Sequence, residues 1–229
     1  MRVSAYIIGR NCELTLAAAL ESVYSQSRPV DEVVYLDDGS TDGSVSIAER
    51  YMDRGLILLR NEITQGIPSS RNRAARECTS DWIAVLDADD RWHCEKNARQ
   101  LAFLEAHPEI GLLGTFAHLI DEKGRTLGTI TTSCTDEEIK QRELISNCFV
   151  HSSVVFRRDM FDRVGGYADL AAAQDYDLML KLSEVTRVGN LPEPLTEHRI
   201  GSDTTSVRRR QTQRSTGSLP HQPRERGAA

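Results

Sequence analysis

Short apolar runs alternate with amphipathic stretches along the first half of the chain. Their period and length predict buried strands over residues 3–8, 32–36, 56–59 and 82–86. Helical periodicity between them predicts four helices: one after Asn11 and others over about 42–53, 69–77 and 95–106. Asn11 could cap the first of these helices. This strict alternation predicts parallel βαβ units, and therefore an α/β fold with a doubly wound, mostly parallel sheet and helices on both faces.

The pattern becomes more mixed after about residue 115. Apolar runs predict strands over 110–119, 125–131 and 152–156, with a hairpin turn at 121–124, and two helices are expected over 136–144 and 176–183. We therefore expect one domain over residues 1–206, made of a regular half (1–115) and a mixed half (116–206). Residues 207–229 are rich in Arg, Gln, Ser, Pro and Gly, and we expect them to form a disordered basic tail.

Carboxylates gather where two of the predicted strands end. Asp37 and Asp38 follow the second strand, and Asp87, Asp89 and Asp90 follow the fourth. Ligands bind at the carboxyl ends of strands in open α/β sheets, and clustered carboxylates repel one another unless a partner compensates them. A divalent cation shared with an anionic substrate would do so, whereas a solvated acidic loop is the alternative. The pattern thus predicts a nucleotide–metal site.

Three further positions could carry chemistry. Asp37 or Asp38 could accept hydrogen bonds from a base or ribose, while Ser40 and Asp42 read as turn and cap residues. Arg71, at a predicted helix start, could contact a base or phosphate, although an ordinary surface arginine fits the sequence equally well.

Asp175 opens another acidic cluster and could act as a general base towards a hydroxyl. The alternative is an acidic first turn of a helix, with Asp177 capping or pairing locally. His151 and His198 are interpreted as hydrogen-bonded structural residues and not as ligands.

Composition and charge exclude several classes of protein. Formal net charge is −6, but residues 207–229 carry six arginines and one glutamate, which leaves −11 on the remaining 206 residues. An acidic body with 6% aromatic residues argues against nucleic-acid binding.

Five scattered cysteines without CxxC spacing predict reduced thiols. Without a signal peptide or a membrane-length apolar run, we expect a cytoplasmic protein, with peripheral contact of the basic tail with the inner membrane face as the weaker alternative.

Taken together, the motifs resemble those of family 2 glycosyltransferases, which have the GT-A fold. The resemblance covers roughly residues 1–206 and rests on the joint order of several segments: residues 3–4 with Asn11, 20–26, 37–42, 70–72, 86–92, 151–157, 164–167 and 174–178. It implies transfer of a sugar from a nucleotide diphosphate donor, a UDP-sugar first of all, usually with inversion and with Mn²⁺ or Mg²⁺. Residues 1–115 then resemble the nucleotide-binding half and 116–206 the acceptor half. A carbohydrate or lipid-linked acceptor, and a role in polysaccharide or glycoconjugate synthesis, are family-level expectations.

By position in that family, Asp38 resembles the residue that contacts the base, with Asp37 nearby, and Arg71 an arginine that lines the nucleotide pocket. Asp87-Ala88-Asp89 resembles the DxD motif, so the resemblance assigns Asp87 to the ribose side and Asp89 to the metal. Asp175 stands where the catalytic base lies.

The sequence departs from the family pattern at three of these places. Arg10 replaces an aromatic residue, and its guanidinium could stack on the base instead. Gln174 replaces the usual Glu before the base, and Gly201 stands where a histidine is frequent, so a third metal or phosphate contact is not expected there.

Two other functions compete with a metal-dependent glycosyltransferase. A sugar-phosphate nucleotidyltransferase would prefer a loop rich in glycine and in lysine or arginine after the first strand, and Gly9-Arg10-Asn11-Cys12 supplies little of one. A non-catalytic nucleotide-sugar-binding module, or an inactive partner of another transferase, would bind nucleotide without turnover.

Overall fold

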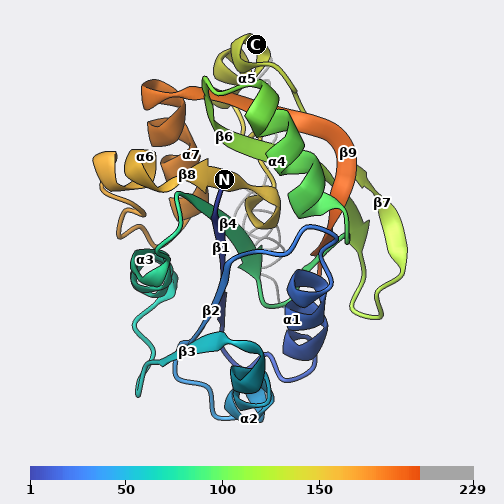
Figure 1. Cartoon of the computed structure of the whole chain (residues 1–229), viewed down its shortest axis with the longest axis vertical. Coiled ribbons are helices and arrows are strands. Elements are labelled where there is room, and N and C mark those ends of the chain that lie inside the picture. Colours follow the sequence, from blue (N-terminus) through green and yellow to red (C-terminus); the bar gives the residue numbers. More distant parts are fainter. Residues whose placement is uncertain (202–229) are drawn as a thin grey trace, which may run out of the picture.

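A nine-stranded mixed sheet runs through the molecule in the order β3-β2-β1-β4-β8-β6-β9-β5, with β7 paired to β6 (Figure 1). The computed structural model describes residues 1–201. The strands are β1 (Val3–Gly9), β2 (Glu32–Asp37), β3 (Leu56–Arg60), β4 (Trp82–Asp87), β5 (Arg91–Trp92), β6 (Ile110–Ile120), β7 (Thr126–Ile130), β8 (Val155–Arg157) and β9 (Arg187–Arg199).

Helices connect these strands and cover the sheet. They are α1 (Leu16–Tyr24), α2 (Ser44–Glu49), α3 (Ile67–Glu77), α4 (Lys96–Ala106), α5 (Asp136–Glu143), α6 (Arg158–Arg163) and α7 (Gln174–Val185), with short 3-10 turns η1 (Met52–Arg54) and η2 (His151–Ser153). None of the helices among residues 1–201 has the length and apolarity that a bilayer span requires.

The first four strands of the sheet order are parallel and aligned at their carboxyl ends. Gly9 on β1 pairs with Asp37 on β2, and Ile8 pairs with Asp87 on β4. The two acidic strand ends therefore flank the end of β1, which is the arrangement predicted from the sequence. Gly9 permits this approach, because a Cβ there would lie 2.8 Å from the Cβ of Ala88.

The other half of the sheet is mixed. β8 is antiparallel to β4 and β6, whereas β9 runs parallel to β6 and antiparallel to β5. The sequence reading missed β9, because Pro192 and Pro194 interrupt its apolar pattern. The register along β6 and β9 shifts at several points, and β9 accommodates the prolines there.

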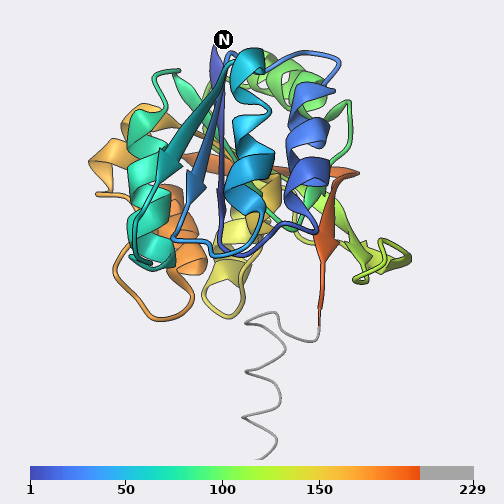
Figure 2. The same cartoon turned by 90° about the horizontal axis from the view of Figure 1, so that it is seen from below.

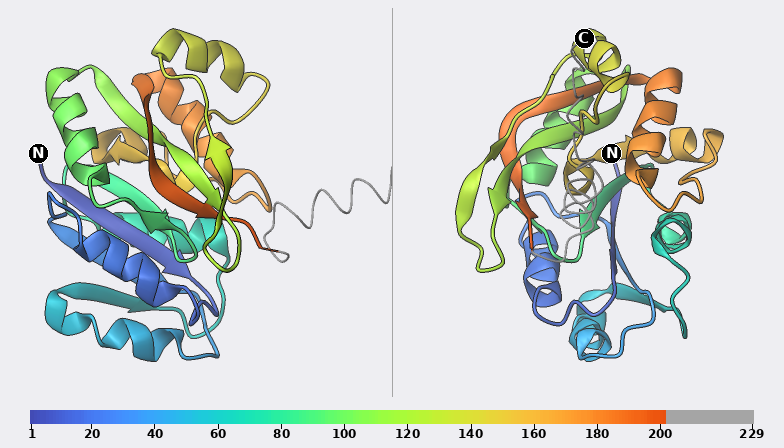
Figure 3. Two further views of the ribbon diagram at one scale, coloured as in Figure 1. Left: turned by 90° about the vertical axis from the view of Figure 1, so that its right-hand side faces the viewer. Right: turned by 180° about the vertical axis from the view of Figure 1, so that it is seen from behind.

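Two apolar cores fill the space between sheet and helices, one on each face. Leu16, Leu20 and Leu101 of α1 and α4 pack on one face, and Ala74, Leu178 and Leu182 of α3 and α7 pack on the other. The right-hand view in Figure 3 shows α1 and α4 on one side of the strands, with α3 and α7 on the opposite side. Helices on both faces of an α/β sheet were predicted, and the structure confirms them.

Several local predictions need correction. Asn11 does not cap α1, which begins at Leu16 after Thr15; the Asn11 backbone is left-handed (φ 52°). The predicted strand over 152–156 is a 3-10 turn followed by the shorter β8, and the helix expected to reach residue 53 ends at Glu49. The hairpin turn is confirmed by a bond from the Gly124 amide to the Asp121 carbonyl. The predicted disordered tail over 207–229 lies outside the described residues.

Candidate functional site

The predicted site residues lie along one edge of the sheet. In Figure 2 the parallel strands run downward, and the loops after β1, β2 and β3 meet at the lower edge together with the loop that precedes α7. This is the edge where helix N-termini and strand ends present free hydrogen-bonding groups.

Asp87, the last residue of β4, is held by two basic side chains. Arg71 from α3 donates from Nη2 to Asp87 Oδ1 at 2.8 Å, and His151 Nδ1 lies 3.4 Å from Asp87 Oδ2. Burial opposes ionisation, but the charges of Arg71 and His151 outweigh it and hold the pKa of Asp87 below its usual range. Asp87 is therefore a carboxylate, as a ribose or metal contact requires.

Arg71 has unused hydrogen-bonding capacity. Its side chain is only 7% exposed, yet its Nε and Nη1 atoms have no hydrogen-bond partner among residues 1–201. Burying a guanidinium with two unpaired nitrogens costs free energy of folding unless an anion accepts hydrogen bonds from them. The alternative prediction of an ordinary surface arginine is wrong at this position.

A chain of buried aromatic hydrogen bonds stands behind Asp87. His151 Nε2 lies 2.8 Å from the Tyr167 hydroxyl, which lies 2.5 Å from the hydroxyl of Tyr6 on β1. The Tyr167 backbone is fixed to α3 by two bonds with the Asn72 side chain. His151 is thus hydrogen-bonded, as predicted, and it links Asp87 to the core.

Asp90 and His198 form a second, separate pair. Asp90 is 1% exposed and accepts bonds from His198 Nδ1 at 3.0 Å and from the Arg199 amide at 2.7 Å. Burial opposes protonation of His198, but the hydrogen bond and charge of Asp90 outweigh it and raise the pKa of His198 to about 9. Asp90 therefore anchors the end of β9 to the loop after β4.

Asp89 has no such partner among the ion pairs of residues 1–201. Its burial and the neighbouring charges of Asp90 and Asp87 raise the pKa of Asp89 to about 7. A half-buried carboxylate in this position is the kind of oxygen ligand that Mn²⁺ or Mg²⁺ takes.

The side chains at this edge fit a cation whose other ligands come from the substrate. In the described part of the chain no three His, Cys, Asp or Glu side chains come together as a metal site. A cation that also binds a diphosphate needs fewer protein ligands. Mg²⁺-type ions are commonly held by one or two carboxylates and substrate phosphates, so one free carboxylate is enough.

Asp38 accepts hydrogen bonds from the loop between β3 and α3 and from the first turn of α3. Its two oxygens accept from the side chains of Asn61 (2.6 Å), Thr64 (2.7 Å) and Ser70 (2.9 Å) and from the amides of Gln65 and Gly66. Burial would raise the pKa of Asp38, but these bonds outweigh it and lower the pKa to about 2. Asp38 thereby fixes the loop that leads directly into Ser70 and Arg71.

Asp37 ends β2, and Arg10 follows the neighbouring strand β1, whose last residue Gly9 pairs with Asp37. Asp37 is buried and accepts from the Ser40 amide at 2.9 Å, whereas Arg10 is exposed at the end of β1. Asp42 has a local role, since it stands just before α2 and accepts from the Ser44 amide, but the N-cap of that helix is Gly43.

Asp175 sits in the first turn of α7 and is half-buried. The buried Tyr167 hydroxyl has its pKa raised, first by burial and in part by the charges of Asp87 and Asp175. Asp175 and Asp87 therefore both lie close enough to the Tyr167 hydroxyl for their charges to affect its pKa. Asp177 pairs with Lys181 at 2.6 Å, which matches the predicted local role.

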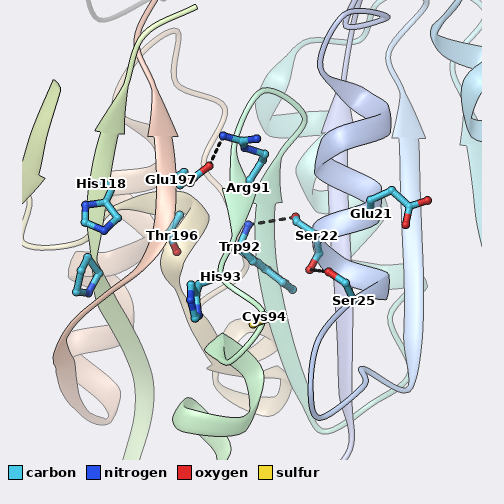
Figure 4. A pocket seen from close by; sticks show the side chains of 11 residues that line it. Glu21, Ser22, Ser25, Arg91, Trp92, His93, Cys94, His118, Thr196 and Glu197 are labelled. Atoms are coloured by element: carbon cyan, nitrogen blue, oxygen red, sulfur yellow. Dashed lines mark hydrogen bonds and ion pairs between the residues drawn. The ribbon is translucent and has the colours of Figure 1, made fainter. Parts of the chain in front are cut away.

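A cavity of about 340 Å³ lies away from this edge, between α1 and strands β5 and β9 (Figure 4). Glu21, His93, His118 and Glu197 are among its lining residues, and Glu197 pairs there with Arg91. None of the predicted site residues lines it. The acidic edge is therefore separate from the lining of this cavity.

The sequence reading overlooked Tyr6 and Tyr167 as individual site residues. Tyr6 is an apolar-looking position within a buried strand, and only its contact with Tyr167, 161 residues away, gives it a polar role. No local pattern in the sequence signals such a pair.

Comparison with known proteins identifies the family. The family model for glycosyl transferase family 2 matches residues 4–165. The chain belongs to glycosyl transferase family 2. The amylovoran biosynthesis glycosyltransferase AmsE of Erwinia amylovora is 32% identical over 198 residues, which cover 85% of this chain and 74% of AmsE.

Solved structures agree with this family 2 assignment at the level of fold. S. aureus TarS in complex with UDP superimposes with a TM-score of 0.72 at 21% identity, over 88% of this chain and 61% of that one. The mannosyltransferase PcManGT of Pyrobaculum calidifontis, solved with GDP-Man and Mn²⁺, gives 0.68 at 20% identity, over 93% and 61%. The chain thus spans about three fifths of these solved chains. The GT-A fold and the glycosyltransferase assignment predicted from the sequence are confirmed.

Proposed function

We propose that this family 2 glycosyltransferase moves a sugar from a nucleotide diphosphate sugar to an acceptor hydroxyl, with inversion and with a divalent cation. The observation that carries the proposal is the pairing of Arg71, a buried guanidinium with two nitrogens that lack a partner among residues 1–201, with Asp87 near Asp89, which forms no ion pair in that range. Together they offer donors for phosphate oxygens and a carboxylate for a cation, which is what a cation-bound diphosphate needs.

On the donor side, Arg71 would donate to the nucleotide, Asp87 would accept from the ribose, and Asp89 would hold the cation. Asp37, Asp38 and Arg10 would border the base. Since both oxygens of Asp38 already accept bonds from the loop, its role would be to shape the pocket wall, and exposed Arg10 would supply the stacking surface. A bound Mn²⁺ or Mg²⁺ would supply Lewis-acid neutralisation of the diphosphate charge.

On the acceptor side, Asp175 would take the proton from the attacking hydroxyl. The acceptor oxygen then forms its bond to the anomeric carbon while the bond from that carbon to the diphosphate oxygen breaks. The nucleoside diphosphate leaves with the electron pair, opposite to the incoming oxygen. A half-buried carboxylate in a helical first turn is suitably placed for this proton transfer.

The relatives support polysaccharide or glycoconjugate synthesis, because AmsE is named for amylovoran biosynthesis. UDP is the first nucleotide to test, since TarS is solved with UDP, while GDP is the alternative that PcManGT suggests. We expect the acceptor to be a carbohydrate or a lipid-linked saccharide. We also expect the family 2 enzyme to act in the cytoplasm.

Isothermal titration with UDP and MnCl₂ tests the metal role of Asp89. The wild-type chain should bind UDP more tightly with Mn²⁺ than with EDTA, and Asp89→Ala should remove that difference. Asp159→Ala is the matched control, because Asp159 pairs with exposed Arg157 away from the acidic edge. Equal Mn²⁺-dependence in Asp89→Ala and wild type would refute the assignment.

Turnover separates the competing functions. Release of UDP from a UDP-sugar in the presence of acceptor supports transfer. Pyrophosphate release from a nucleoside triphosphate and a sugar phosphate would instead identify a nucleotidyltransferase. Binding without either product would identify a non-catalytic module.

A further inference from the structure

The acidic loop, residues 87–90, is fixed at both of its ends. The Asp87 amide donates to the Ser152 hydroxyl at 3.1 Å, and that hydroxyl donates to the Asp90 carboxylate. The Asp90 amide in turn donates to the Asp87 carbonyl at 3.0 Å, which closes the loop into a turn. None of these bonds involves Asp89, the residue proposed to hold the cation.

Arg199, the last residue of β9, supports the acidic loop at Asp89. Its Nε atom donates to the Asp89 carbonyl at 2.8 Å, and its backbone amide donates to Asp90 Oδ1 at 2.7 Å. Its Nη1 atom donates to the carbonyls of Asp121 (2.8 Å) and Glu122 (3.0 Å), in the turn between β6 and β7. Figure 3 shows the end of β9 beside that turn. One guanidinium therefore connects the Asp89 backbone to the hairpin turn.

The hairpin turn, residues 121–125, is itself closed by local bonds. Asp121 Oδ1 accepts from the amides of Lys123 and Arg125, each at 2.9 Å, and Asp121 Oδ2 accepts from Arg125 Nε at 2.7 Å. The Asp121 amide donates to the Arg125 carbonyl, and the Asp121 carbonyl accepts from the Gly124 amide. An aspartate that bonds to the backbone of its own turn in this way favours one turn conformation. The carbonyls that accept from Arg199 are therefore held in place.

The guanidinium group suits this connection through its shape. Its donors lie in one plane and point in fixed directions, so Nε and Nη1 reach the acidic loop and the hairpin turn at the same time. All three of these side-chain bonds end on backbone carbonyls, so they depend on where the two backbones lie. A lysine would keep the positive charge, but its single ammonium group lacks the planar fork.

We infer that Arg199 is a positioning residue, which holds the Asp89 backbone where the Asp89 side chain can bind the cation. This inference rests on the proposed function, because it takes Asp89 as the cation ligand. Groups that orient a metal ligand commonly change metal affinity by roughly 10–100-fold when they are removed, although they do not touch the metal. Arg199 should therefore act on cation binding and not on the nucleotide itself.

Titration calorimetry with UDP, in MnCl₂ and in EDTA, tests the inference. For Arg199→Met, the dissociation constant of UDP with Mn²⁺ should rise about tenfold or more, while that in EDTA should stay within about twofold of wild type. Arg157→Met is the matched control, because Arg157 pairs with Trp82 at the amino end of β4, whereas the acidic loop follows its carboxyl end.

Two results with Arg199→Met would overturn the inference. One is a Mn²⁺ effect on UDP affinity equal to that of wild type. The other is an equal loss of UDP affinity with Mn²⁺ and in EDTA, since Arg199 would then contact the nucleotide or support only the fold.

Arg199→Lys separates position from charge. Lysine keeps the positive charge beside the acidic loop but cannot donate to the loop and the hairpin turn together. The variant should therefore lose Mn²⁺-dependent UDP binding as Arg199→Met does. Wild-type binding by Arg199→Lys would contradict the inference, because the charge alone would then be sufficient.

Asp121→Ala tests the hairpin turn and leaves Arg199 itself unchanged. Loss of the local bonds of the turn should weaken Mn²⁺-dependent UDP binding by about threefold or more. Asp121→Ala added to Arg199→Met should cause no further loss, because the effect of the turn passes through the guanidinium. Additive losses in this double-mutant cycle would count against the inference.

The same titrations distinguish failure of the inference from failure of the proposed function. A wild type whose UDP affinity does not respond to Mn²⁺ would refute the cation role of Asp89 and the inference together. If wild type and Arg199→Met respond equally to Mn²⁺, the inference alone is refuted and the proposed function stands.

Discussion

Three aspartates at the site have three different environments, and each environment decides what the carboxylate can do. Asp87 is held ionised by Arg71 and His151. Asp38 is ionised with a pKa of about 2, because four donors of the loop before α3 and the Ser70 hydroxyl of α3 surround it. Asp89 forms no ion pair within residues 1–201, and burial with the charges of Asp90 and Asp87 outweighs the charge of His198 and raises the pKa of Asp89 to about 7. Of the three, Asp89 gains most from a bound cation.

Asp38→Asn should destabilise the family 2 fold at neutral pH. The folded pKa of Asp38 lies below the ordinary value, so its contribution is fully present above about pH 4 and is lost as pH falls towards 2. A shift from 3.8 to about 2 corresponds to roughly 2 kcal/mol. Urea unfolding at pH 7 and at pH 2.5 measures this: the gap between wild type and Asp38→Asn should be large at pH 7 and small at pH 2.5.

The exposed Asp53→Asn is the control for that experiment, because Asp53 makes no contact with the loop between β3 and α3. An equal gap between wild type and Asp38→Asn at both pH values would contradict the role of the ionised carboxylate.

Asp175→Asn should separate chemistry from donor binding. The amide keeps the shape of the side chain but cannot accept the acceptor proton, so turnover should fall by roughly 10²–10⁴-fold. UDP affinity should stay within about twofold of wild type, because Asp175 takes no part in the hydrogen bond between Arg71 and Asp87. Asp177→Asn is the matched control on the same helix. Retained turnover in Asp175→Asn would remove the residue from the mechanism.

Elements far apart in sequence are joined behind the site by a single tyrosine. Tyr167 links the 3-10 turn η2 through His151, β1 through Tyr6 and α3 through Asn72. Its ring also lies 5.5 Å from the Arg71 guanidinium carbon. Tyr167 thereby fixes η2 to β1 and α3 beside Asp87.

Tyr167→Phe should lower both stability and UDP affinity. The ring and its contacts with Arg71 and Phe161 remain, but the buried Tyr6 hydroxyl and His151 Nε2 lose their partner, which costs about 1–3 kcal/mol. Freed His151 no longer holds Asp87 in place, so the dissociation constant for UDP with Mn²⁺ should rise several-fold. Titration calorimetry and thermal unfolding measure the two effects.

Tyr6→Phe distinguishes positioning from simple stability. It removes one hydroxyl but keeps the bond between Tyr167 and His151, so it should lower the melting temperature while UDP affinity stays near wild type. If both variants lose UDP affinity equally, Tyr167 has only a structural role.

Local patterns were enough to predict β1, β2, β4 and the helices between them, because each burial pattern is complete within a few residues. The same strand patterns also predicted that acidic residues stand at the carboxyl ends of β2 and β4. β9 could not be found this way, since its prolines break the pattern and its pairing with β6 is set by residues more than 70 positions away. The unpaired nitrogens of Arg71 depend on burial by distant elements and have no sequence signal.

At the scale of the whole molecule, we expect UDP and a divalent cation together to stabilise the folded chain against thermal unfolding. UDP alone brings negative charge to an edge with Asp87, Asp89 and Asp90, and Mn²⁺ alone meets one unpaired carboxylate. In the proposed site Arg71 and Asp89 would both gain a partner when the two ligands bind together, and such a coupling is reciprocal. Ligand at a hundred times its dissociation constant adds about 2.7 kcal/mol, which corresponds to a melting temperature rise of roughly 5–10 °C for a chain of this size. Thermal unfolding with UDP and Mn²⁺ should show this rise, and each alone should give less than about 2 °C. Asp89→Ala should lose the joint effect, whereas a full shift with UDP in EDTA would mean that the edge binds the nucleotide without a cation.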